Sequence, residues 1–157
     1  MAAPLSPDPL RMAVVAAARL WIGTPYRHQA ARRGVGCDCL GLVAGVWADV
    51  YDAMPDYHRS YSADWAESAG AGEPLLDACS VRCGTVSIGD EKPGDLLVFR
   101  WSRHVAAKHL AILSTPALMI HARERHAVCE TALTGWWRRR IAAVFAFPPL
   151  DHRSGTH

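Results

Sequence analysis

Apolar residues recur at helical spacing in two segments near the beginning of the chain. In residues 8–21 they fall on one helix face, and the preceding Ser6-Pro7-Asp8-Pro9 sequence is typical of a helix start. From Cys39 to about Tyr51 a second apolar face repeats at the same spacing. The residues that define the two faces are Val14, Val15, Ala18 and Trp21, then Leu40, Val43, Ala44, Trp47 and Tyr51. The pattern predicts two helices joined by a turn and a Gly-rich approach to Cys39.

The second half of the chain carries shorter apolar runs separated by turn residues, which predict strands. The expected strands lie near residues 95–101, 109–114, 117–122, 127–131 and 141–147. The region from Asp52 to Lys92 is rich in loop residues, with one or two short helices around 63–80 and turn signals at Gly70, Gly72 and Pro74. Helices followed by an antiparallel sheet of about five strands predict an α+β fold.

Length and composition indicate one globular domain. The chain has 157 residues, half of them apolar, which is enough for a substantial hydrophobic core. We expect the domain to cover residues 1–150, with a flexible tail at residues 151–157. The net charge of +2 gives no indication of direct nucleic-acid binding, and the basic run Arg138-Arg139-Arg140 is interpreted as a solvated face.

The sequence contains no apolar span that approaches the roughly 20 residues of a transmembrane helix. Residues 12–18 resemble the apolar part of a signal peptide, but a proline-rich segment with Asp8 precedes them. We therefore interpret them as part of the first helix and expect synthesis in the cytoplasm without a signal peptide. The odd number of cysteines, five, argues against a complete disulfide framework and fits a reducing compartment.

Cys39 lies where the Gly-rich segment runs into the second predicted helix. Unpaired backbone N–H groups and the helix dipole at such a position favour the thiolate, so we expect a lowered pKa for Cys39. The thiolate is the nucleophilic form of cysteine, and this placement is typical of a cysteine hydrolase. A buried structural cysteine is the alternative interpretation.

Two histidines are placed to serve as a base and its orienting group. His109 begins one predicted strand, and His121 ends the next one. If the two strands pair in antiparallel fashion, His109 lies beside Cys39 and His121 lies behind His109, which is the arrangement that activates a thiol. His104, Glu124 and His126 are neighbouring alternatives for the third position, and a hydrogen-bonded core histidine is the alternative for His109.

A zinc site is the competing interpretation of the cysteines and histidines. The pairs are Cys37-x-Cys39 and Cys79-x3-Cys83, and neither has the two-residue gap that is usual in structural zinc sites. We therefore expect no metal, and we interpret the cysteines other than Cys39 as small core residues. Cys79 and Cys83 fall on one helix face, but Gly84 weakens that helix.

Five short motifs occur in an order that resembles the NlpC/P60 superfamily of papain-like cysteine peptidases. They are Gly23-Thr24-Pro25-Tyr26-Arg27, Asp38-Cys39-x-Gly41-Leu42-Val43, Pro93-Gly94-Asp95-Leu96, His109-Leu110-Ala111-Ile112 and Ile120-His121-Ala122. Single short motifs recur by chance, but five in order are a strong indication. The resemblance implies a papain-like fold and hydrolysis of peptide bonds in the bacterial cell wall, typically in the peptidoglycan stem, without a cofactor.

The resemblance also assigns roles to residues of this chain. It implies that Cys39 is the nucleophile, His109 the general base and His121 the polar residue that orients the base. It implies that Tyr26 lies near the nucleophile, where its hydroxyl donates to an oxyanion or to the substrate. Asp38 matches an acidic residue that partners a substrate amine or the loop backbone, and a helix N-cap is an equally sufficient reason for Asp there.

A narrower resemblance concerns the peptidases of phage and gene transfer agent tails. It depends on Cys37-Asp38-Cys39-Leu40-Gly41-Leu42, on Pro55-Asp56-Tyr57 with Tyr61-Ser62-x-Asp64-Trp65, and on the closing run from Ile141 to Pro148. It implies assembly with tail proteins and action in the periplasm or cell wall of the target cell during DNA delivery. Two alternatives remain, a non-catalytic tail-tip connector and an amidase or acyltransferase of the same fold.

Three features of the sequence depart from the superfamily pattern. Leu40 stands where most members have Ser, Gln29-Ala30 replaces a Gly pair that many members have, and Cys37 replaces a more usual aromatic or aliphatic residue. All three are expected near the substrate groove, so we expect them to affect which peptide bond is cleaved rather than the catalytic mechanism.

Overall fold

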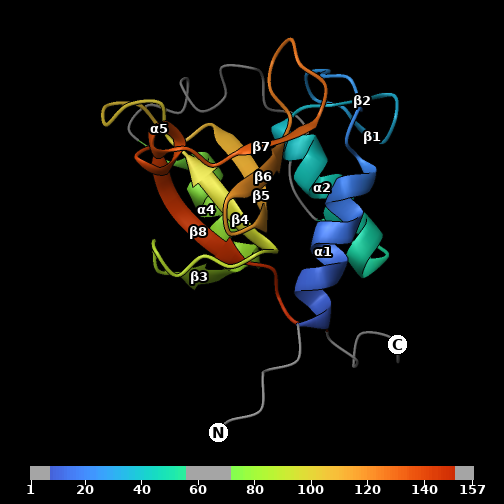
Figure 1. Cartoon of the computed structure of the whole chain (residues 1–157), viewed down its shortest axis with the longest axis horizontal. Coiled ribbons are helices and arrows are strands. Elements are labelled where there is room, and N and C mark those ends of the chain that lie inside the picture. Colours follow the sequence, from blue (N-terminus) through green and yellow to red (C-terminus); the bar gives the residue numbers. More distant parts are fainter. Residues whose placement is uncertain (1–7, 56–71, 151–157) are drawn as a thin grey trace, which may run out of the picture.

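The computed structural model describes residues 8–55 and 72–150, which form helices packed on a curved antiparallel sheet (Figure 1). The predicted flexible tail at 151–157 lies outside the described residues. So do residues 63–71 of the range 63–80, in which one or two short helices were expected, and Tyr57, Tyr61 and Trp65. No helix in the described ranges is long and apolar enough to cross a membrane.

The two predicted N-terminal helices are confirmed. Helix α1 spans Pro9–Leu20, with Asp8 as its N-cap accepting from Leu10 N–H at 2.9 Å. Helix α2 spans Cys39–Tyr51 and follows the N-cap Asp38. The helices approach closely because α2 has Gly45 facing the Trp21 ring, where an added Cβ would lie 2.0 Å from the indole. The Trp21 indole N–H donates to Asp49 at 3.1 Å, which completes the α1–α2 contact.

A six-stranded sheet carries the second half of the domain, with every neighbouring pair antiparallel. The spatial order is β3-β8-β4-β5-β6-β7. The strands are β3 (Gly84–Val86), β4 (Asp95–Phe99), β5 (His109–Thr115), β6 (Leu118–His121), β7 (Cys129–Ala132) and β8 (Ile141–Ala146). The five predicted strands are therefore confirmed within a few residues, and the α+β class is confirmed with them.

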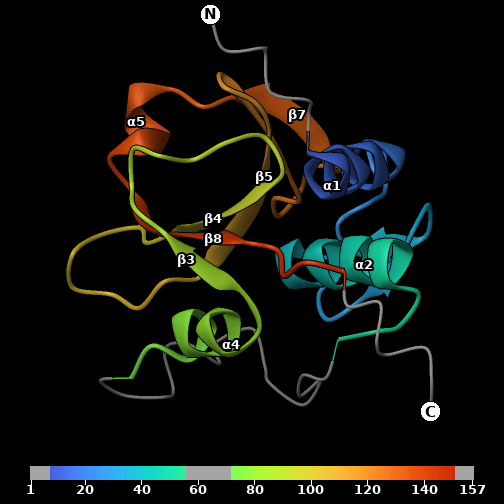
Figure 2. The same ribbon diagram turned by 90° about the horizontal axis from the view of Figure 1, so that it is seen from below.

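Both faces of the central strands are buried. One face of the sheet packs against α1, α2 and α4 (Pro74–Arg82) through a cluster that includes Leu96, Leu110 and Ile112. The other face buries Leu97, Ala111 and Leu113 against Trp137 and other residues near the short helix α5 (Gly135–Arg138). Figure 2 shows α1 and α2 side by side at one side of the curved sheet, with α4 near β3. Because alternate residues of a strand point to opposite faces, β4 and β5 read as continuous apolar runs.

Three elements differ from the sequence predictions. The edge strand β3 was not predicted, because it has only three residues, two of them exposed, which carry almost no periodic signal. A two-stranded ribbon, β1 (Ala31–Arg32) with β2 (Gly36–Cys37), was missed for the same reason. Pro74 begins α4 rather than marking only a turn, since proline is well tolerated in the first helical turn.

The Pro93-Gly94-Asp95 motif ties α1 to the sheet. Asp95 is almost fully buried and accepts from the Arg11 guanidinium at 2.6 Å and from Lys92 N–H at 2.8 Å. Gly94 has φ +93°, and an added Cβ would lie 2.8 Å from the Arg11 backbone. The motif is therefore structural, and it holds the helix layer in register with β4.

Candidate active site

The loop before Cys39 is fixed by the Asp38 carboxylate. Its Oδ1 accepts from Gly41 N–H at 2.7 Å, which caps α2, and its Oδ2 accepts from Gln29 N–H at 2.8 Å. His28 Nδ1 also lies 3.8 Å from Oδ2. Asp38 thus fills two of the predicted roles, the N-cap and the partner of the loop backbone, and its two oxygens are both occupied by main-chain donors.

The same loop contains Gln29 and Ala30, which stand where many family members have a Gly pair. Gln29 takes φ +61°, in the left-handed region that favours glycine, while its N–H reaches Asp38. The start of α2 packs so closely on the loop that an added Cβ at Gly41 would lie 1.8 Å from the Ala30 carbonyl oxygen. The conformation of the loop and the position of Cys39 are therefore set together.

Cys39 is the first residue of α2, and its thiol donates to the Lys108 carbonyl oxygen at 3.6 Å. Burial raises the pKa of Cys39 to about 12, and the neighbouring Asp38 carboxylate raises it further. Backbone N–H groups of Leu110, Leu40 and Cys39 itself act in the opposite direction. The expected lowering of the pKa is wrong for this resting structure, because desolvation outweighs the helix-start N–H groups.

The two predicted histidines meet across neighbouring strands. His109 Nε2 lies 2.9 Å from His121 Nδ1, and His121 Nε2 lies 2.9 Å from Thr131 Oγ1. The chain of hydrogen bonds runs across β5, β6 and β7 and is almost fully buried at both histidines. The alternative third residues His104, Glu124 and His126 are exposed and do not take part in it. The hydrogen bond of the Cys39 thiol goes to the residue before His109 rather than to its ring.

The hydrogen-bond chain restricts which nitrogen carries each proton. If His109 Nε2–H donates to His121 Nδ1, then His121 Nε2–H donates to Thr131, and His109 Nδ1 is left as an acceptor. Burial lowers the pKa of His109 to about 3, with the neighbouring His121 and Arg123 lowering it further. Burial and then Arg123 lower the pKa of His121 to about 4. Both rings are therefore neutral at neutral pH.

Thr131 is a site residue that sequence reasoning missed. It lies on β7, two residues beyond Cys129, the direct cross-strand partner of His121. Such diagonal neighbours are within reach of a long side chain, but the pairing is visible only when the register is known. A single Thr on a short strand carries no signal of its own.

Tyr26 lies close to Cys39. An isolated bridge pairs Tyr26 with Cys37, and the side chain is half-buried. Burial raises the pKa of the Tyr26 phenol to about 12, and the nearby Cys39 and Asp38 add to the effect. The hydroxyl therefore keeps its proton and is able to donate a hydrogen bond at all physiological pH values.

Leu40, Cys37, Cys79 and Cys83 lie in the core or pack against it, whereas Cys129 is a half-buried residue of β7 that belongs to neither core cluster. Leu40 is half-buried and lines an apolar cavity of about 50 Å³ between α2, α4 and β5, which Cys79 and Cys83 also line. All five cysteines are free, and Cys37 is fully buried. Among residues 8–55 and 72–150, no group of three or more Cys, His, Asp or Glu side chains is arranged to hold a metal ion.

A cysteine at a helix start, packed on an antiparallel sheet that carries a buried histidine pair, defines a papain-like α+β fold. The chain belongs to the NlpC/P60 family, whose sequence profile matches residues 23–145. No curated protein matches the sequence.

Solved structures share this fold at low sequence identity. The NlpC/p60 domain of the peptidoglycan hydrolase SagA is 22% identical, with a TM-score of 0.59, over 87% of this chain and 98% of that domain. The peptidoglycan hydrolase RipB from Mycobacterium tuberculosis is 18% identical, with a TM-score of 0.60, over 95% of this chain and 74% of RipB. An NlpC/P60 family protein from Bacillus cereus is 19% identical, with a TM-score of 0.65, over 91% of this chain. The match spans only 42% of the Bacillus cereus protein and 45% of a Staphylococcus aureus relative.

Proposed function

We propose that this protein is a cysteine peptidase that hydrolyses peptide bonds in the peptidoglycan stem. The observation that carries the proposal is the His109–His121–Thr131 hydrogen-bond chain, which begins one residue after Lys108, the residue whose carbonyl accepts from the thiol of Cys39 at the start of α2. Burying polar side chains costs free energy unless every group is hydrogen-bonded. A buried and hydrogen-bonded histidine pair of this kind is suited to holding a base in one orientation. Membership of the NlpC/P60 family and the fold shared with the hydrolases SagA and RipB support the cell-wall substrate.

In the proposed mechanism the resting pair is neutral, because burial disfavours both the Cys39 thiolate and the His109 imidazolium. The Cys39 proton leaves the Lys108 carbonyl and passes to His109 Nδ1 as sulfur attacks the substrate carbonyl carbon. The imidazolium then gives this proton to the leaving amine as the peptide C–N bond breaks. Water, deprotonated by His109, hydrolyses the thioester and releases the acid and the free thiol.

Two donors are placed to stabilise the negative oxygen that forms during attack. One is the Tyr26 hydroxyl, which stays protonated next to Cys39. The other is the backbone N–H of Cys39, which lies at the start of α2. Preorganised donors of this kind are worth roughly 3–4 kcal/mol each in related chemistry.

The biological setting that we propose is the tail of a phage-like particle or gene transfer agent. Its support is the Cys37-Asp38-Cys39-Leu40-Gly41-Leu42 version of the nucleophile motif, which resembles that of tail-module peptidases. In this setting the protein is made in the cytoplasm, joins tail proteins and acts in the periplasm or wall of the target cell. The chemistry needs no cofactor.

Digestion of purified peptidoglycan by the wild type and by Cys39→Ala tests the proposal. We expect stem-peptide fragments by mass spectrometry from the wild type, and a loss of at least about 10³-fold in rate with Cys39→Ala. Equal fragment release by both proteins would remove Cys39 from the mechanism. Intact peptidoglycan with both would overturn the peptidase and favour the connector.

A further inference from the structure

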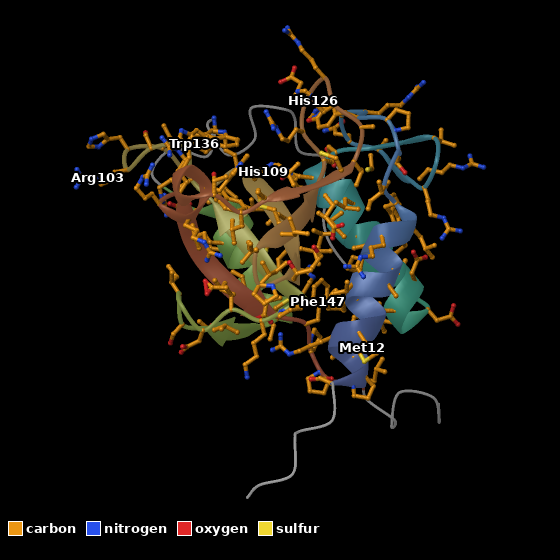
Figure 3. The ribbon with its side chains drawn as sticks, in the orientation of Figure 1. Met12, Arg103, His109, His126, Trp136 and Phe147 are labelled. Atoms are coloured by element: carbon orange, nitrogen blue, oxygen red, sulfur yellow. The ribbon has the colours of Figure 1, made fainter. Side chains whose placement is uncertain are left out.

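Three tryptophans form a continuous cluster over the proposed base. The Trp101 ring stacks on His109, with centroids 5.5 Å apart and an angle of 24°, and Trp137 contacts His109 at 5.5 Å and His121 at 5.3 Å. Trp136 lies 4.9 Å from Trp137 and 6.4 Å from Trp101. We call Trp101, Trp136 and Trp137 the tryptophan platform. Figure 3 shows His109 and Trp136 near the same end of the sheet, with Arg103 farther out.

The outer two rings of the platform are open to solvent. Trp101 is 40% exposed and Trp136 is 46% exposed, although indoles are usually buried. Trp137 packs beneath them, edge-on to Phe99 at 5.0 Å. The mechanism proposed above does not use the two exposed rings. Large apolar side chains exposed beside a catalytic group mark a surface that binds a ligand.

The platform is held in place before any ligand arrives. The Arg140 guanidinium lies 3.7 Å from the Trp136 ring centroid and donates to the Trp136 carbonyl at 2.8 Å. The loop that carries Trp101 is fixed by Arg100, which pairs with Glu73 and donates to the Val105 carbonyl at 2.9 Å. Glu73 also accepts from Ala107 N–H at 3.0 Å. A preformed surface binds without first losing side-chain entropy.

The charge around the platform is positive. Segments 100–108 and 134–141, which carry the three tryptophans, contain Arg and Lys residues but no Asp or Glu. The nearest carboxylate that contacts them is Glu73, and it is paired with Arg100. Arg103, Arg138 and Arg139 are exposed. The surface therefore suits a ligand with apolar ring faces and negative charges.

We infer that the tryptophan platform binds a sugar ring of the glycan strand to which the stem peptide is attached. The inference rests on the proposed function. The positive C–H faces of a pyranose ring fit the negative face of an indole, and the surrounding cations fit the carboxylates of peptidoglycan. Because Trp101 stacks directly on His109, a sugar held by the platform lies beside the bond under attack.

Comparison of two substrates tests the platform. Peptidoglycan digested with a muramidase gives disaccharide-peptides, and removal of the sugars with an amidase gives the same peptides alone. We expect Trp136→Ala to lower kcat/KM on disaccharide-peptides about tenfold, the size of one stacking contact, and to leave cleavage of the free peptides unchanged. Trp136→Tyr, which keeps a ring, should retain most of the activity, and Ile88→Ala is the control for loss of an exposed apolar side chain. Equal activity of Trp136→Ala and wild type on both substrates would overturn the inference.

A binding experiment separates failure of the platform from failure of the peptidase. N-Acetylglucosamine tetramer is titrated into Cys39→Ala and into Cys39→Ala/Trp136→Ala, with tryptophan fluorescence and calorimetry as readouts. Saturable binding that Trp136→Ala weakens about tenfold would support the glycan site even if no peptide bond is cut. Absence of sugar binding, or binding of a single-stranded oligonucleotide in its place, would overturn it.

Discussion

At the scale of single residues, the candidate site is organised by a hydrogen-bond chain whose two histidines are buried. His121 is fully buried, and each of its ring nitrogens has one protein partner. The proton between His109 and His121 therefore has two possible placements, and we expect the one in which the hydroxyl of Thr131 accepts from His121 Nε2–H. Only that placement leaves His109 Nδ1 able to accept a proton from Cys39.

Replacement of Thr131 tests this placement. Thr131→Val removes the acceptor at nearly constant volume, so we expect kcat to fall about tenfold to a hundredfold with little change in KM. Thr131→Ser keeps the hydroxyl and should retain activity. Ring-nitrogen NMR shifts of His121 report the placement of the proton directly. Wild-type kcat and unchanged His121 shifts in Thr131→Val would show that Thr131 does not position the base.

At the scale of elements, the close approach of α1 and α2 sets the position of Cys39, the proposed nucleophile. Gly45 leaves room for the Trp21 ring, which is 97% buried. The N-terminal end of α2 is fixed separately, by the Asp38 cap and by the contact of Gly41 with the Ala30 carbonyl. Helix α2 is therefore held at its start and in its middle, and Cys39 has a defined place against β5.

A methyl group added at Gly45 would force this contact apart. Its Cβ would lie 2.0 Å from the Trp21 ring, so we expect Gly45→Ala to lower the free energy of unfolding by about 1–3 kcal/mol. Gly84→Ala is the matched control, because its added Cβ meets nothing within 4 Å and its φ is not positive. Urea denaturation measures both. A stability of Gly45→Ala equal to that of Gly84→Ala would contradict the tight contact.

At the scale of the whole molecule, two buried neutral histidines couple stability to pH. The pKa values of about 3 for His109 and about 4 for His121 in the folded state lie below the ordinary value near 6.5. As pH falls below 6.5, the unfolded chain binds protons that the folded protein does not. Stability therefore falls with pH in this window, by up to about 1.4 kcal/mol per pH unit for each histidine.

Thermal unfolding between pH 7 and pH 5 measures this coupling, in a range where most carboxylates stay ionised. We expect the melting temperature to fall across the range, and His121→Asn to reduce the slope because it removes one of the two buried titrating groups. His104→Asn, at an exposed position, should leave the slope unchanged. An identical slope in wild type and His121→Asn would show that His121 is not buried neutral in solution.

Most of the secondary structure could be predicted from the sequence, because a long apolar face with a regular period fits only one type of element. Helices α1 and α2 and strands β4, β5, β6 and β8 follow from apolar spacing with their boundaries within about two residues. The helix α4 was only partly predicted, since its Pro74 was read as a turn signal. Strands β1, β2 and β3 were not predicted, because two or three residues are too few to show a periodic pattern.

Motif order and local spacing in the sequence by themselves determined the NlpC/P60 family, the fold class and the candidates Cys39, His109 and His121. These depend on residue types and short-range periodicity, which a linear chain displays directly. Tertiary structure alone decided that His109 contacts His121, that Thr131 completes the hydrogen-bond chain, and that Trp101 and Trp137 pack on the His109 ring. It also reversed the expected direction of the Cys39 pKa shift, because desolvation depends on which groups pack around the sulfur. The histidine contacts depend on strand register, which is set by contacts between residues far apart in sequence.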